Sequence, residues 1–142
     1  MIILDTDHIS ILQHADSGIA ASLSERLANS PDRDVATTAI SLEEQSRSWL
    51  SLISRYSDVR RQVTYYDRFV ATCRFFAKWR VVPFDDQSAE RFRQLRAARI
   101  RIASTDLKIA SICLVNGATL LSRNLRDFRK VPGLHVEDWL TE

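Results

Sequence analysis

Three acidic side chains interrupt apolar segments at separate places in the 142-residue chain. Asp5 directly follows the apolar run 2–4, Glu44 follows the segment 35–40, and Asp106 opens a helical pattern further on. Carboxylate oxygens are preferred ligands of Mg²⁺, and bound Mg²⁺ can polarise a phosphodiester and activate water for in-line attack. If these acids meet, the chemistry to expect is metal-assisted phosphodiester hydrolysis.

Asp106 gives a strong single signal. At helical spacing it shares a face with Ile109, Ala110 and Cys113, and that face should meet the sheet. Burying an ionised carboxylate is costly, and a bound cation is one of the few available compensations. The competing interpretation is a first-turn Asp held by the helix dipole, worth roughly 0.3–1 kcal/mol. Asp5 has a similar alternative, because it could simply cap the next turn or helix.

Glu44 and the segment after the fourth expected strand are more ambiguous. Ser41 is predicted as a helix N-cap with Glu44 completing a capping box, and Glu44 lies nearly opposite the apolar helical face. From a first turn just beyond a strand, Glu44 could still lean back towards the sheet edge. Asn124 and Asp127 could also face a strand end, or could be plain loop residues.

The elements that must position these residues alternate between strands and helices. We predict strands over 2–4, 35–40, 80–84, 118–121 and 134–136, a turn over 6–8, and helices over 41–53, 59–77, 86–98 and 104–116. Ser104 is the expected cap of the last helix, and Gly117 its end. This alternation predicts an α/β fold with a central, mainly parallel sheet of four to five strands, covered on both faces. No linker divides the chain, so residues 1–142 are expected to form one domain.

The segment 59–77 carries an apolar stripe at steps of four and three, which predicts a long amphipathic helix. The stripe consists of Val59, Val63, Tyr66, Val70, Cys73 and Ala77. It needs another helix to pack against, either within the chain or in a second copy of it.

Composition narrows the setting. The net charge is +2 and seventeen of the twenty cations are arginine, whose planar fork suits phosphate. Genomic base composition or solvated helix faces would explain that bias equally well. The two cysteines are far apart and have no ligand-spaced partner, so a disulfide or zinc site is not expected. No apolar run approaches the roughly 20 residues of a membrane span, so we expect a soluble, unprocessed cytoplasmic protein.

Three segments together resemble the PIN-domain ribonucleases, in particular the VapC toxins of type II toxin–antitoxin pairs. They are LDTDHIS, TTAISLEE and the long STDLKIASICLVNGATLLSRNLRDFRKVPGL, which closes in VEDW. The resemblance spans both ends of the chain and is weakest from Ser46 to Val82. It implies a PIN-like three-layer α/β/α sandwich, an endoribonuclease dependent on Mg²⁺ or Mn²⁺, a homodimeric toxin, and a small cognate antitoxin that blocks the site.

Carried over by residue, the resemblance implies that Asp5, Glu44 and Asp106 are catalytic and bind metal. The family often has a Thr-x-Asp motif where this chain has Ser122-Arg123-Asn124. A further ligand is therefore expected from Asn124 or from Asp127, which we also count as catalytic. Asp7 is expected to support the ligands or the turn.

Arginines near these segments are candidate RNA contacts, because phosphate contacts position a substrate without reading its sequence. The candidates are Arg99, Arg101, Arg123 and Arg126. A solvated helix face is the other interpretation.

Two other functions stay open. One is a catalytically silent RNA- or partner-binding module, which the Asn124 departure allows. The other is a haloacid-dehalogenase-like phosphatase, because Asp5 and Asp7 resemble its DxD motif; that enzyme needs a later lysine, and only Lys108 and Lys130 lie near motif ends.

Overall fold

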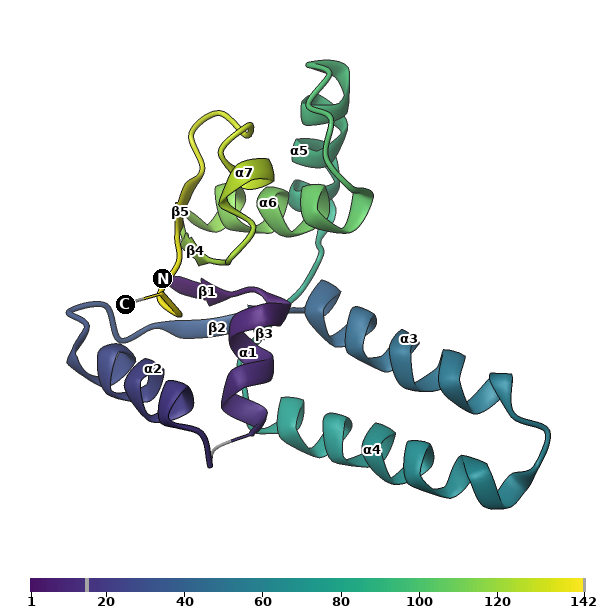
Figure 1. Ribbon diagram of the computed structural model, residues 1–142. Coiled ribbons are helices and arrows are strands. Elements are labelled where there is room, and N and C mark those ends of the chain that lie inside the picture. The colour runs from purple at the N-terminus through teal and green to yellow at the C-terminus, as the bar shows by residue number, and fades with distance from the viewer. Residues whose placement is uncertain (15, 142) are drawn as a thin grey trace.

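The computed structural model describes residues 1–14 and 16–141 and is built around one parallel sheet (Figure 1). The strand order is β3-β2-β1-β4-β5, and every paired neighbour runs parallel. The strands are β1 (Ile2–Leu4), β2 (Val35–Thr38), β3 (Val81–Val82), β4 (Thr119–Leu121) and β5 (His135–Glu137). The helices are α1 (Thr6–Gln13), α2 (Gly18–Asn29), α3 (Ala39–Arg55), α4 (Val59–Ala77), α5 (Asp86–Ala97), α6 (Ser104–Asn116) and α7 (Leu125–Phe128).

The central strand β1 is buried on both faces, because alternate side chains of a strand point to opposite sides. Ile3 joins a core with Leu107, Ile109 and Phe128 under α6 and α7. Ile2 and Leu4 join a second core on the opposite face, together with Ile9 of α1, Leu23 of α2 and Phe76 of α4. The two cores confirm the three-layer α/β/α sandwich.

Helices α3 and α4 form a long antiparallel pair that projects from the sheet (Figure 1). Inside it, the indole N–H of Trp49 donates to the Thr72 hydroxyl at 2.9 Å. The bounds predicted for α4 are confirmed, but intramolecular packing of its apolar stripe is not. Val59, Val63, Tyr66 and Val70 are 44–71% exposed, whereas Thr72 and Phe76 on another face are buried.

Several helix starts differ from the sequence expectation. The predicted turn over 6–8 is the first turn of α1, with Asp5 as its N-cap. β2 ends at Thr38, and the Thr38 side chain caps α3 by accepting from the Ser41 N–H at 3.2 Å. Ser41 is therefore not the cap and lies inside α3, because the buried threonine three residues earlier already satisfies its free N–H.

At the other end of the chain the differences are smaller. Ser104 is the first residue of α6 and not its cap, because Ala103 precedes it without a side-chain bond. Gly117 ends α6 in a left-handed conformation at φ 61°, as predicted. The sequence did not predict α2 or α7, and β3, β4 and β5 differ by one or two residues at their ends. Within the described residues, no helix has the length and apolar character needed to cross a membrane.

Candidate active site

Asp5 lies where the carboxyl ends of the two central strands meet. Leu4 of β1 pairs with Leu121 of β4, so Asp5 and Ser122 follow side by side. Asp5 is 7% exposed. One carboxylate oxygen accepts from the Thr6 N–H and the other from the Ser122 hydroxyl, both at 2.7 Å. Asp5 thus caps α1 and also projects a buried carboxylate at the sheet edge.

The surroundings of Asp5 disfavour its negative charge. Burial raises the pKa of Asp5 from 3.8 to about 7, and the nearby Asp7 charge adds to the effect, although the bonds from Ser122 and Thr6 oppose it. Near neutral pH this carboxyl either holds a proton or needs a compensating cation.

Glu44 faces this edge from α3. The Thr6 hydroxyl donates to Glu44 Oε2 at 3.0 Å. The capping-box prediction is therefore wrong, because Glu44 bonds across to α1 and not back to the start of its own helix. Burial raises the pKa of Glu44, and the negative charge of Asp106 raises it further.

Asp106 stands in the first turn of α6 and is half-buried. Burial raises the pKa of Asp106, and the Asp127 charge adds to the rise. The Asn124 amide nitrogen lies 3.2 Å from an oxygen of Asp106 and 3.2 Å from an oxygen of Asp127. Asn124 therefore bridges the two acids as a hydrogen-bond donor, and its ligand role stays a prediction.

Asp127 differs electrostatically from the other acids. It pairs with Lys130 at 3.2 Å, and hydrogen bonds from Asn124 and Lys130 hold the pKa of Asp127 below its usual value. A carboxylate already neutralised by the protein has less need of a metal ion. Its predicted catalytic and ligand roles remain predictions.

The carboxylate oxygens of the site can be compared with the ligands that a hydrated Mg²⁺ ion requires. Across residues 1–14 and 16–141, no three His, Cys, Asp or Glu side chains converge into a ready metal cage. Asp5, Glu44 and Asp106 nevertheless carry raised pKa values, and the Asp106 charge contributes to the other two. Mg²⁺ keeps several waters and needs only one or two direct carboxylates. The oxygen donors and their uncompensated charge fit such an ion.

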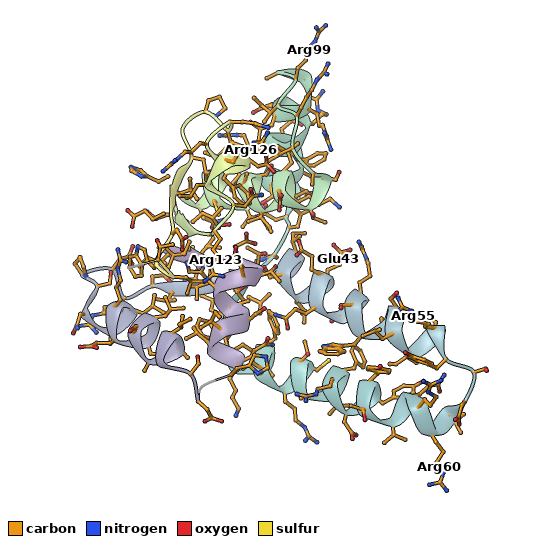
Figure 2. The ribbon with its side chains drawn as sticks, viewed as in Figure 1. Glu43, Arg55, Arg60, Arg99, Arg123 and Arg126 are labelled. Carbon is orange, nitrogen blue, oxygen red and sulfur yellow. The ribbon has the colours of Figure 1, made fainter. Side chains whose placement is uncertain are left out.

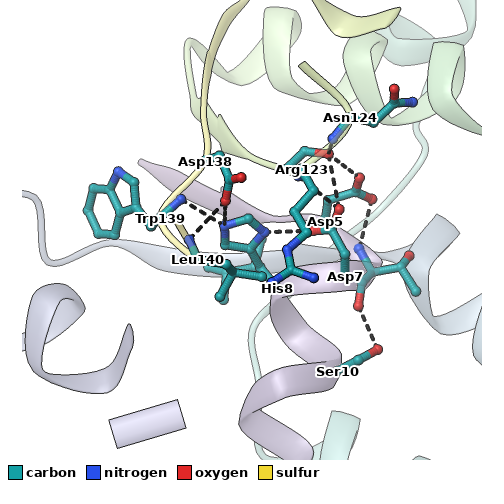
Figure 3. Close-up of polar contacts among 12 residues, drawn as sticks. Asp5, Asp7, His8, Ser10, Arg123, Asn124, Asp138, Trp139 and Leu140 are labelled. Atoms are coloured by element: carbon teal, nitrogen blue, oxygen red, sulfur yellow. Dashed lines mark hydrogen bonds and ion pairs between the residues drawn. The ribbon is translucent and has the colours of Figure 1, made fainter. Parts of the chain in front are cut away.

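Hydroxyl donors form a part of the site that sequence reasoning missed. The Thr6 hydroxyl donates to Glu44, and the Ser122 hydroxyl donates to Asp5. The only available signal was that Ser122 occupies the hydroxyl position of the Thr-x-Asp motif. Asp7 binds the turn after β4, accepting from the Arg123 N–H at 2.9 Å (Figure 3). Its carboxylate supports the turn, as the sequence suggested.

The candidate RNA-binding arginines do not gather in one place. Arg123 lies at the acidic edge and Arg126 on α7 above it, whereas Arg99 extends from the far outer end of α5 (Figure 2). Arg99 has a left-handed φ of 60° in the exposed α5–α6 connection, and Arg101 is exposed nearby. Only Arg123 and Arg126 are placed beside the acids.

A parallel α/β/α sandwich with acids at the carboxyl ends of its central strands defines an α/β protein with an acidic site at that edge of the sheet. The chain belongs to the PIN domain family, whose family model matches residues 2–134. This match sets aside the haloacid-dehalogenase interpretation of Asp5 and Asp7.

Individual proteins resemble the chain at lower identity. Over 69 residues it is 32% identical to the tRNA(fMet)-specific endonuclease VapC of Salmonella typhimurium, covering 46% of this chain and 52% of that protein. The chain spans about half the length of the curated relatives it matches. VapBC-1 from nontypeable Haemophilus influenzae shares the fold with a TM-score of 0.73 and 22% identity, covering 99% of this chain and 100% of that one. A toxin-antitoxin complex from Klebsiella pneumoniae aligns with a TM-score of 0.62 and 18% identity, covering 98% of each chain.

Proposed function

We propose that this protein is an endoribonuclease dependent on Mg²⁺ or Mn²⁺ that acts as the toxin of a type II toxin–antitoxin pair. The observation that carries the proposal is the group formed by Asp5, Glu44 and Asp106, three acids with raised pKa values at one sheet edge. Similarity to a protein named as a tRNA-specific endonuclease supports RNA as the substrate.

Each of the three acids is held in place by hydrogen bonds. Thr6 and Ser122 fix both oxygens of Asp5, the Thr6 hydroxyl fixes Glu44, and Asn124 ties Asp106 to Asp127. These hydrogen bonds hold the carboxylate oxygens in fixed positions before a metal ion binds. When bound, the metal ion supplies Lewis-acid polarisation of the phosphodiester and activates water. Arg123, which follows β4, and Arg126 on α7 would position the RNA backbone (Figure 2).

The direct test is cleavage of labelled structured RNA by purified protein with Mg²⁺, Mn²⁺ or EDTA. We expect cleavage with either metal, and loss to the EDTA background in Asp5→Asn and Asp106→Asn. Asp86→Asn, in an exposed first turn of α5, is the matched control and should keep wild-type activity. Full activity in both site variants, or equal cleavage in EDTA, would contradict the proposal.

The RNA-binding role of the arginines is tested by salt dependence. Replacing Arg123 and Arg126 with Gln should weaken RNA binding and reduce the slope of log K against log[salt] by about 0.7 per lost contact. Arg55→Gln, at the distal end of α3, is the control and should leave the slope unchanged (Figure 2). An unchanged slope in the double variant would exclude these contacts. Arg99 and Arg101 lie further from the acids and would contact the backbone only of a long RNA.

Two protein partners belong to the proposal. A small cognate antitoxin would cover the acidic edge, as the named toxin-antitoxin complex of similar fold suggests. A second copy of the chain would cover the exposed stripe on α4. The stripe residues Val59, Val63, Tyr66 and Val70 recur at helical spacing along the exposed side of α4, so a second α4 helix could cover them side by side.

A catalytically silent RNA- or partner-binding module is the second candidate. The favouring observation is that Asn124 donates to the acids and Asp127 already pairs with Lys130, which leaves the fourth position without a free carboxylate. RNA binding without cleavage under any metal, by protein with wild-type folding, would establish it.

A further inference from the structure

His8 connects the acidic site to the C-terminal end of the described chain. Its side chain is fully buried in the first turns of α1. Nδ1 lies 2.6 Å from an Asp7 oxygen, and Nε2 accepts from the Trp139 N–H at 3.1 Å. Figure 3 shows His8 between these two partners, which are 132 positions apart in sequence.

The two partners fix the tautomer of the imidazole. An ionised Asp7 can only accept and the Trp139 N–H can only donate, so Nδ1 carries the proton and Nε2 is the acceptor. Asp138 Oδ1 lies 3.6 Å from Nε2 and accepts from the Leu140 N–H at 2.8 Å. The imidazole is therefore a hydrogen-bond donor at Nδ1 and an acceptor at Nε2.

Asp7 carries the connection onwards to the turn after β4. One of its oxygens faces His8, and the other accepts from the Arg123 N–H at 2.9 Å, with the Ser122 hydroxyl 3.4 Å away. Burial alone would raise the pKa of Asp7, but hydrogen bonds from His8 and the Arg123 N–H hold it below its usual value. Both oxygens of this carboxylate are thus occupied by protein donors.

The C-terminal segment is anchored at its other side. The Arg26 guanidinium of α2 lies 4.3 Å from the centre of the Trp139 ring, and the Trp139 indole N–H donates to Glu137 at 2.6 Å. Trp139 therefore gives His8 a fixed support from outside the site.

We infer that His8 is a positioning residue whose Nδ1 bond holds Asp7, and through Asp7 the Ser122–Asn124 turn, while its Nε2 bond separately joins the anchored segment 137–140. The effect on catalysis rests on the proposed nuclease function; the effect on the turn does not.

Two substitutions separate the two bonds of His8. His8→Asn retains a donor at the Nδ1 position for Asp7 and loses the acceptor for Trp139. His8→Gln retains an acceptor at the Nε2 position for Trp139 and loses the donor for Asp7. Asp7→Asn, which leaves His8 in place, tests the same turn if both His8 variants fold poorly. His14→Gln, on the exposed end of α1, is the matched control.

Amide hydrogen exchange and steady-state cleavage are measured on the same proteins. We expect faster exchange of the Arg123 amide in His8→Gln and Asp7→Asn, and faster exchange of the Trp139 amide only in His8→Asn. The kcat should fall roughly 10–100-fold in His8→Gln with KM nearly unchanged, as for other supporting residues of metal sites, and stay near wild type in His8→Asn.

The outcomes separate the two claims. If wild-type protein cleaves no RNA, the proposed function fails, while the exchange pattern still decides the role of His8. The inference would be overturned if the exchange rate of the Arg123 amide changed equally in His8→Gln and His8→Asn, or in neither. It would also be overturned if kcat fell in His8→Asn, which loses the Trp139 bond, and not in His8→Gln.

Discussion

Asp5 combines two roles that are usually separate, since it is both a helix cap and a buried acid. Its pKa is raised to about 7 because burial and the charge of Asp7 disfavour ionisation. In the unfolded chain the same carboxyl returns to its ordinary value of 3.8. Between these values the folded state binds more protons than the unfolded state, so this group makes folding less favourable as pH rises.

The stability of the metal-free protein should therefore depend on pH through Asp5. Compared with Asp5→Asn, the wild type should lose roughly 3 kcal/mol of unfolding free energy between pH 5 and pH 8. Urea denaturation of both proteins in EDTA at the two pH values measures the difference. A difference that is constant with pH would show that Asp5 is not held in its neutral form.

The sequence points to Asp5, Glu44 and Asp106 as candidate acids, but not to the side chains that hydrogen-bond to them. Asp5, Glu44 and Asp106 each follow or open a recognisable element, and a carboxylate beside apolar residues is an unusual signal. Ser122 donates to Asp5 across 117 positions. A serine in a loop carries no mark of such a contact until the strands are placed.

At the scale of elements, α4 shows why a periodic pattern can predict a helix and still misplace its buried face. Two stripes with the same spacing run along it. Tyr65, Phe69 and Phe76 lie on the more buried side, and Val59, Val63, Tyr66 and Val70 on the exposed side. Both satisfy the helical period, and the packing favours the aromatic stripe because large rings bury more apolar area.

The exposed stripe gives a prediction about assembly. Val63 is 55% exposed, so Val63→Glu should leave the fold intact and convert a dimer into a monomer in gel filtration. Ile19→Glu on α2, where Ile19 is 46% exposed, is the matched control and should not change the elution volume. A monomeric wild type at micromolar concentration, or a Val63→Glu protein that still dimerises, would remove the proposed interface.

Helix α2 was missed for a related reason. Its segment is rich in Ala and Ser, and only Ala20 and Leu23 are buried. Two buried side chains over twelve residues give too weak a period to distinguish a helix from a polar loop.

At the scale of the whole molecule, the sequence predicted a parallel sheet but not its strand order. The order β3-β2-β1-β4-β5 makes β1 and β4 neighbours although more than a hundred residues separate them. That adjacency places Asp5 beside Ser122 and brings Asp106 and Asn124 to the same edge. Local patterns along the chain do not encode this order.

The most direct test of the account is Mn²⁺ binding measured by isothermal titration calorimetry. We predict that wild-type protein binds Mn²⁺, that Asp5→Asn, Glu44→Gln and Asp106→Asn each weaken binding by at least about tenfold, and that Asp86→Asn does not. Unchanged affinity in all three site variants, with folding intact, would contradict the claim that these acids form one metal site.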